Sequence, residues 1–218
     1  VLHYGLTKFL IYEEAFMSKT KEMDLTCGNP FWSLLKFAIP VILGNLFQLF
    51  YTLADSVIVG KTLGADALAA VGSTSIIIYF VFCFINGFTG GFGICLGQYC
   101  GAKDENGMRK SIAVSTLLSI AFTVVLTLIC CLSARMFLIL MKVPSDIEDA
   151  AYAYMFVVLL GTGATVFYNM ISNMLRALGD SKTPLYFLVF SSVLNIVLDV
   201  LFILPLHMGV AGAAWATI

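Results

Sequence analysis

Apolar residues fill five stretches of the chain, each long enough to cross a membrane as a helix. The stretches are Phe31–Val59, Leu68–Gly97, Ile112–Met141, Ala151–Leu175 and Leu185–Leu206, and a sixth begins near Val210. A hydrocarbon layer of ~30 Å needs about 20 helical residues at ~1.5 Å each. The pattern therefore predicts an all-α membrane protein with five complete transmembrane helices and the start of a sixth.

The segments between these stretches are short and polar. They cover Gly60–Ala67, Gln98–Ser111, Lys142–Asp149, Ala177–Pro184 and His207–Gly209. None is long enough for a folded domain outside the membrane. We therefore interpret residues 30–218 as one transmembrane unit, which is truncated inside its sixth helix. Residues 1–29 precede the first apolar stretch, and we interpret them as a non-native or disordered amino-terminal segment.

Helix-modifying residues lie inside two of the stretches. Pro40 cannot donate a hydrogen bond to the carbonyl of Lys36, so it predicts a kink in the first helix. The second stretch contains Gly87, Gly90, Gly91, Gly93 and Gly97, followed by Gly101. Three pairs among them have the four-residue spacing that lets helix backbones approach closely in lipid. We interpret them mainly as packing residues, with a flexible functional hinge as the alternative.

Composition supports the membrane interpretation. Hydrophobic residues make up 60% of the 218 residues and charged residues only 11%, with a mean hydropathy of +0.97, whereas about a quarter of a soluble domain is charged. The net charge of -1 and the lack of basic runs with aromatic residues argue against nucleic-acid binding. The cysteines and histidines show no metal-ligand spacing, and we find no nucleophile–base arrangement or phosphate loop, so an enzyme is not predicted.

Basic residues are distributed unequally between the two sides of the predicted helices. Nine fall on one side and three on the other, namely Lys61, Arg135 and Lys142; the nine are Lys8, Lys19, Lys21, Lys36, Lys103, Arg109, Lys110, Arg176 and Lys182. The positive-inside rule then places the amino terminus and the second and fourth loops in the cytoplasm. Together with the short loops, this predicts a multi-pass protein of a bacterial cell (inner) membrane.

Two acidic residues, Asp55 and Asp199, lie inside apolar stretches. An aspartate in the middle of a membrane helix costs on the order of 2.5–3.5 kcal/mol on insertion scales, and such residues usually face a cavity or a partner. Lys36, near the start of the first stretch and far along the helix from Asp55, is the only Lys or Arg in these two stretches, so neither acid has a basic residue nearby in its own stretch. A functional role is therefore predicted, although polar contacts that only join helices remain the alternative.

Polar side chains near these acids repeat at helical spacing. Residues three and four apart share a helix face, so three polar stripes are predicted: Asn45, Gln48, Thr52 and Asp55 with Tyr51 alongside; Ser191, Asn195 and Asp199; and Asn169, Ser172, Asn173 and Arg176. Three such stripes imply a water-containing interior. We interpret Gln48, Tyr51, Asn169 and Asn173 as residues that line this cavity.

The acid pair suits a cation. Carboxylate and amide oxygens are good ligands for a hard cation such as Na⁺. Buried carboxylates also bind H⁺ readily, because loss of water disfavours their charged form, and a second acid nearby strengthens the effect. The residue types do not choose between the two ions, so both remain open.

Several motifs together resemble the multidrug and toxic compound extrusion (MATE) transporters. They are Ile39-Pro40 with Gln48, Tyr51, Asp55 and Val59-Gly60; Gly97-Gln98-Tyr99-Cys100-Gly101-Ala102; Leu175 to Pro184; Asn195-Ile-Val-Leu-Asp199; and Gly209-Val-Ala-Gly212. The resemblance covers Pro30 to Ile218. Within it, Gly179 is expected to end a helix with a positive φ, and Pro184 to open the next one.

The resemblance implies a twelve-helix protein of two six-helix lobes, of which this chain is the amino-terminal lobe. In that family the lobe binds the coupling ion, Na⁺ or H⁺, at positions that match Asp55, Asn195, Asp199 and Thr217, with Gln48 lining the cavity. The implied activity is a cation-coupled antiporter that exports drugs and other organic, often cationic compounds by alternating access. Its expected partners are those compounds, the lipid bilayer and the missing carboxy-terminal lobe, and no cofactor besides the coupling ion is expected.

Two other functions remain open. One is a flippase for lipid-linked oligosaccharide or peptidoglycan precursors from the same broader superfamily, which would favour a cationic cavity rather than an acidic one. The other is a membrane anchor subunit that does not transport.

Overall fold

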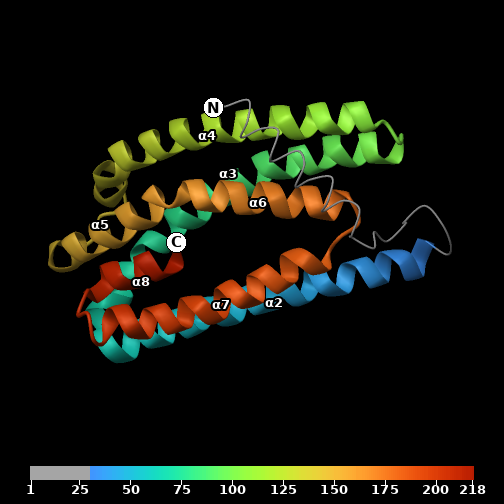
Figure 1. The fold of residues 1–218 in the computed structure, drawn as a ribbon. Helices are drawn as coiled ribbons and strands as arrows, with labels where there is room; N and C mark the ends of the chain where they lie inside the picture. The colour runs from blue at the N-terminus through green and yellow to red at the C-terminus, as the bar shows by residue number, and fades with distance from the viewer. Residues whose placement is uncertain (1–29) are drawn as a thin grey trace.

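The computed structural model describes residues 30–218, and these form helices joined by short turns (Figure 1). The helices are α2 (Pro30–Leu63), α3 (Ala65–Gly101), α4 (Glu105–Leu140), α5 (Ser145–Leu160), α6 (Thr162–Ala177), α7 (Lys182–Ile203) and α8 (Gly209–Thr217). The predicted all-α architecture is confirmed. The separate segment expected over residues 1–29 lies outside the described residues.

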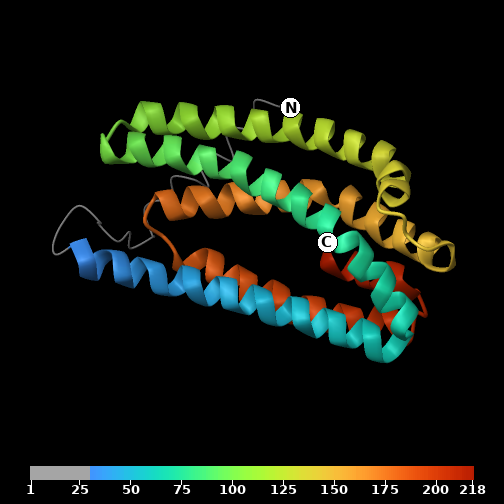
Figure 2. The same cartoon turned by 180° about the vertical axis from the view of Figure 1, so that it is seen from behind.

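The helices form two groups. The helix α8 and the start of α3 connect one group to the other. α2 and α7 run side by side along their length in both views, and α3, α4 and the α5–α6 pair form the other group (Figures 1 and 2). The short helix α8 lies against α5 and α7, at the end where α2 finishes and α5 begins (Figure 1). Residues near the ends of α2 and α7 are therefore brought close to α5 and α8.

Four helices of the described chain, α2, α3, α4 and α7, are long and apolar enough to cross a membrane, and the bent α5–α6 pair makes a fifth span if it is counted as one. The five predicted spans thus correspond to the observed helices. Large apolar side chains are exposed along them, for example Leu132 at 83% and Phe80 at 72%, as expected where lipid is the solvent.

The first four turns are shorter than the sequence predicted, whereas the last, over residues 204–208, is longer than the predicted His207–Gly209. Gly64 alone separates α2 from α3, with φ 92°, where an eight-residue loop was expected. The helix α4 begins within the second predicted loop, because the side chain of Asp104 caps it by accepting a hydrogen bond from the Gly107 N–H at 3.0 Å. Gly179 has φ 89° after the end of α6, as predicted. α7 begins at Lys182, two residues before Pro184.

The fourth predicted span is not one continuous helix, which corrects the expectation of a single helix over Ala151–Leu175. α5 and α6 meet at Gly161 with a bend of 43°. A side chain at Gly161 would collide with Ile218 at the end of α8. The Thr162 hydroxyl donates to the Leu159 carbonyl at 2.8 Å and lies 2.7 Å from the Thr127 hydroxyl of α4. These contacts provide hydrogen bonds for a helix break inside the membrane.

Only part of the glycine pattern in α3 makes close helix contacts. A Cβ on Gly93 would lie 3.0 Å from the Asn173 carbonyl oxygen of α6, and one on Gly97 would lie 3.9 Å from the Cβ of Ala177. By contrast, a Cβ on Gly87 or Gly91 would meet nothing within 4 Å. A Cβ on Gly101 would likewise meet nothing within 4 Å, so the packing interpretation applies to Gly93 and Gly97. In α2, the helix continues through Pro40 to Leu63.

Candidate functional site

The two membrane aspartates are buried beside one another where α2 packs on α7. Asp55 of α2 is 8% exposed and Asp199 of α7 is fully buried. Their side chains are close enough to interact directly. Asn195, one turn before Asp199, is 7% exposed on the same buried face. The structure thus brings together three of the four residues expected to bind a cation.

The polar atoms of this cluster lack partners. Both carboxylate oxygens of Asp199, one oxygen of Asp55 and both amide atoms of Asn195 are buried without a hydrogen bond to the protein. Elsewhere in residues 30–218, Thr123 and Arg176 contribute one such atom each. Buried polar atoms are normally hydrogen-bonded, so a concentration of exceptions in one place requires an explanation. A bound cation or water would supply the missing contacts.

Two tyrosines complete the surroundings of the acids. Tyr51, one turn before Asp55, is half-buried and interacts with Asp55, Gln48 and Tyr168. Tyr154 of α5 is 7% exposed and is close enough to interact with both carboxylates and with Tyr51. Sequence reasoning did not single out Tyr154, because a tyrosine inside an apolar stretch gives no pattern that separates it from an ordinary packing residue.

An apolar cluster closes one side of the acid pair. Val59 and Ile203 lie one turn after Asp55 and Asp199 respectively, and they are 0% and 3% exposed. They pack in one cluster with Tyr154 and with Ala213 of α8. This cluster lies between the carboxylates and the end of the bundle where α2 and α7 finish, so it excludes water from that side.

The polar stripe on α2 faces outward over most of its length. Asn45, Gln48 and Thr52 are exposed in the described chain, whereas Asp55 at its end is buried. The Thr52 hydroxyl donates to the Gln48 carbonyl of its own helix at 2.9 Å. On α7 the stripe is confirmed for Asn195 and Asp199. Ser191 is exposed, and its neighbour Ser192 is buried on that face instead.

Thr217 is not joined to the acids in this conformation. Its half-buried hydroxyl donates to the Ala213 carbonyl within α8 at 2.9 Å. The next residue, Ile218, packs against the break between α5 and α6 at Gly161. Among the contacts of residues 30–218, none links Thr217 to Asp55 or Asp199. Its role as a cation ligand stays a prediction.

The two asparagines of α6 make local and interhelical contacts. The Asn169 amide donates to the Thr165 carbonyl of its own helix at 2.8 Å. The Asn173 amide donates to the Thr89 hydroxyl of α3 at 3.2 Å, and its oxygen accepts from Arg176 at 3.4 Å. Asn173 thus contributes to packing between α3 and α6. Cavity lining by Asn169 and Asn173 stays a prediction.

The chemistry of the cluster fits a light, hard cation. The residues 30–218 contain no group of three or more His, Cys, Asp and Glu side chains that could hold a metal ion. Two carboxylates and one carboxamide instead provide oxygen ligands, the type that Na⁺ and other hard cations prefer. The same two carboxylates can alternatively share a proton, since like charges in a buried site disfavour double ionisation.

Comparison with known proteins gives a consistent result. The MatE family model matches residues 40–201. The chain is 38% identical over 198 residues to "Probable multidrug resistance protein YpnP" of Bacillus subtilis, and this alignment covers 91% of the chain and 44% of that protein. It is 30% identical over 189 residues to "Probable multidrug resistance protein NorM" of Thermotoga maritima, covering 85% of the chain and 40% of that protein.

Solved structures agree with the sequence matches. A multidrug resistance MATE family transporter of the MOP superfamily, solved in an outward-facing conformation, superposes with a TM-score of 0.83 at 31% identity, over 91% of this chain and 44% of that one. The chain thus spans less than half the length of the relatives that it matches. The match and the apolar helices together describe one lobe of a multi-pass membrane protein.

Proposed function

The chain belongs to the MatE family, and from this premise we propose that it is the amino-terminal lobe of an antiporter that exports organic compounds. The proposed driving force is inward movement of Na⁺ or H⁺ through the acid pair. The observation that carries the proposal is the pair itself: Asp55 and Asp199 are buried together with carboxylate oxygens that lack protein partners. The family and its apolar helices support a membrane transporter, and the relatives' names support drugs as its substrates.

The acid pair works as a switch because its charge determines how tightly the surrounding helices pack. With both carboxylates ionised, their repulsion and their need for water favour an opened arrangement of α2, α7 and α5. A proton or Na⁺ would reduce the charge, and Asn195 and Tyr154 would complete the contacts. The bound state can therefore pack closely. Transport requires the organic substrate to prefer the other arrangement, so that each ligand displaces the other.

The exposed polar stripe of α2 supports a second lobe across a water-containing cavity. Asn45, Gln48 and Thr52 lie within a membrane-spanning helix but are exposed in the described chain. Polar side chains in a membrane helix usually face protein or water rather than lipid. We propose that a carboxy-terminal lobe faces this stripe, with Gln48 and Tyr51 lining the substrate cavity between the lobes and Asn169 and Asn173 deeper within it.

The direction of transport follows from the basic residues. Six of the nine basic residues in the described chain lie near the starts of α2, α4 and α7 and the end of α6, and we propose that these ends face the cytoplasm. Asp55 and Asp199 then lie nearer the outer ends of α2 and α7. Ions that enter from outside would reach them after opening of the apolar cluster around Val59 and Ile203.

The test is efflux from cells by the complete transporter carrying Asp55→Asn or Asp199→Asn. Asparagine keeps the shape of the side chain but removes its charge, so a structural role would survive the change. We expect efflux of a fluorescent cationic dye to lose its dependence on the ion gradient and to fall to the level of cells without the transporter. Asp66→Asn is the matched control, because Asp66 is an exposed acid at the start of α3.

Imposed gradients in reconstituted vesicles identify the ion. An inward Na⁺ gradient at equal pH and an inward H⁺ gradient without Na⁺ are applied separately, and dye movement is recorded for each. One gradient should drive export by the unmodified protein and by Asp66→Asn but not by Asp199→Asn. Undiminished export by Asp55→Asn and Asp199→Asn under both gradients would refute the ion switch.

A flippase for pyrophosphate-linked lipid precursors is the less favoured function. Such a substrate requires a cationic cavity, whereas the buried cluster between α2 and α7 is acidic. Binding of a pyrophosphate lipid without ion-driven dye export would favour the flippase, and the absence of both activities would favour an anchor subunit.

A further inference from the structure

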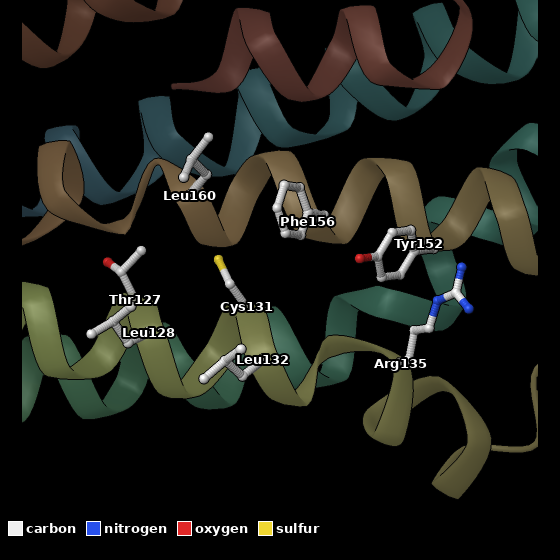
Figure 3. Close-up of a pocket in the computed structure, with 8 residues that line it drawn as sticks. All are labelled: Thr127, Leu128, Cys131, Leu132, Arg135, Tyr152, Phe156 and Leu160. Atoms are coloured by element: carbon white, nitrogen blue, oxygen red, sulfur yellow. The ribbon is translucent and has the colours of Figure 1, made fainter.

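A groove separate from the acid pair lies between α4 and α5. Its volume is about 530 Å³, within the range of small-molecule sites. The residues that line it are Thr127, Leu128, Cys131, Leu132, Arg135, Tyr152, Phe156 and Leu160, and Figure 3 shows their arrangement on the two helices. Leu128 and Leu132 are 57% and 83% exposed, so the groove opens on the surface that faces lipid.

One end of the groove is cationic. The Arg135 guanidinium lies over the Tyr152 ring, 5.2 Å from its centroid, as seen in Figure 3. An arginine at a membrane surface extends its charged group toward polar surroundings while its methylene groups stay on apolar residues. Within the described chain, this guanidinium contacts the face of the Tyr152 ring. Its N–H groups therefore remain available to a hydrogen-bond acceptor.

The other end is apolar and lies deeper in the membrane. Arg135 is five residues before the end of α4 and Tyr152 is seven residues after the start of α5, so both lie roughly 8–10 Å from the helix ends at ~1.5 Å per residue. Thr127 and Leu160 lie about 20–22 Å from those ends by the same rise, and the hydrogen bond between Thr127 and Thr162 closes the groove there. The groove therefore runs along α4 and α5, from near their shared turn toward the middle of the span.

We propose that this groove binds a glycerophospholipid of the leaflet in which α4 ends and α5 begins. The lipid phosphate would accept hydrogen bonds from Arg135, because guanidinium N–H groups match phosphate oxygens in geometry and charge. One acyl chain would follow Leu132, Phe156 and Leu160 toward the middle of the membrane. The cationic end of the groove thus lies at the depth of a phospholipid headgroup, and its apolar end lies at the depth of the acyl chain.

The acids at the start of α5 limit the choice of headgroup. Asp146, Glu148 and Asp149 lie in its first turns, on the headgroup side of Tyr152. They repel additional negative charge, whereas an ammonium group beyond the phosphate would interact with them favourably. The site therefore recognises the phosphate primarily, and it binds a zwitterionic phospholipid at least as well as an anionic one.

The experiment is native mass spectrometry of the protein in detergent, titrated separately with phosphatidylethanolamine, phosphatidylglycerol and diacylglycerol. Arg135→Gln removes the charge, and Cys131→Phe fills the groove, into which the Cys131 side chain points (Figure 3). Lys142→Gln is the matched control, because Lys142 is an exposed base beyond the end of α4, on the same side of the membrane but outside the groove.

We expect the unmodified protein and Lys142→Gln to retain one phospholipid that survives detergent removal. Arg135→Gln should weaken this binding about tenfold, as is typical for the loss of a charge-assisted hydrogen bond, and Cys131→Phe should abolish it. Diacylglycerol, which lacks the phosphate, should not be retained.

Three results would overturn the proposal. The first is equal retention of phospholipid by Arg135→Gln and Lys142→Gln. The second is equal retention of diacylglycerol, which would mean apolar filling only. The third is a dimer that the Arg135 substitution dissociates, which would make a second copy of the chain the occupant. If circular dichroism shows that Cys131→Phe does not fold, the proposal is tested by phospholipid retention in Arg135→Gln compared with Lys142→Gln.

Discussion

The close approach of α3 to α6 at Gly93 can be tested by adding a single methyl group. A Cβ at this position would lie 3.0 Å from the Asn173 carbonyl oxygen and 3.3 Å from the Asn173 Cβ. Even favourable C–H···O contacts between helices have carbon–oxygen distances of about 3.3–3.6 Å. The clash is with helix backbone, which cannot rotate away, so Gly93→Ala requires α6 to move by several tenths of an ångström.

The cost of this movement can be bounded. Overpacking of a close contact typically costs about 1–3 kcal/mol. The Thr89–Asn173 hydrogen bond lies one turn away, and at 3.2 Å it has little room to lengthen before it is lost, at about 1 kcal/mol. Alanine at the same time favours the helix by up to ~1 kcal/mol relative to glycine. A net destabilisation of about 1–3 kcal/mol is therefore expected.

Gly91→Ala is the control that separates the steric cost of Gly93→Ala from the helix preference of alanine, because a Cβ at Gly91 would meet nothing within 4 Å. It gains the same helix preference without the clash. The measurement is thermal unfolding in detergent by intrinsic fluorescence, with both variants side by side. At about 2–4 °C per kcal/mol for a chain of this size, Gly93→Ala should unfold several degrees below Gly91→Ala. If Gly93→Ala unfolds at or above the temperature of Gly91→Ala, the close contact does not stabilise the lobe.

Three further outcomes are expected. Asp104→Ala removes the side-chain cap on the Gly107 N–H and should lower the free energy of unfolding by about 0.5–2 kcal/mol in the same thermal assay, whereas Asp104→Asn should retain most of the cap. Thr127→Val should destabilise the lobe by roughly 1 kcal/mol, because it leaves Thr162 without its 2.7 Å partner at the bend; an unchanged unfolding temperature would contradict this. For a Na⁺-coupled protein, NaCl should raise the unfolding temperature more than KCl at equal ionic strength, and Asp199→Asn should abolish the difference.

The membrane helices and the acid pair follow from local sequence because both have local causes. Long apolar runs are typical of membrane spans, and a lone aspartate inside such a run is a candidate functional position whatever the tertiary arrangement. The interval between Asn195 and Asp199 also predicted correctly that both share a buried face of α7. These predictions depend on helix geometry and on the cost of charge in lipid, which do not require knowledge of the neighbours.

The features that escaped prediction depend on contacts between distant segments. The bend at Gly161 is fixed by Ile218 of α8 and by Thr127 of α4, and neither is visible from the apolar run that α5 and α6 share. Tyr154 became part of the site only because α5 packs near the ends of α2 and α7, in one cluster with Val59 and Ile203. The short turn at Gly64 arises because its φ of 92° reverses the chain in one residue, whereas the charges of Lys61 and Asp66 had suggested a longer loop.

The surroundings of the acid pair are asymmetric, and this has a consequence for the proposed transport cycle. Toward the ends of α2 and α7, the pair is covered by Val59, Ile203 and Ala213. In the opposite direction along α2, the stripe that leads away from Asp55 is polar and exposed at Thr52 and Gln48. Under the proposed function, an ion bound at the acid pair would therefore exchange with water more easily from the stripe side in this conformation. Access from the other side requires the apolar cluster to separate. The helix α8 contributes to that cluster, and Ile218 at its end contacts the bend between α5 and α6. Movement that exposes the acids to the opposite side must consequently displace α8, and through Ile218 it must also change the contact at Gly161.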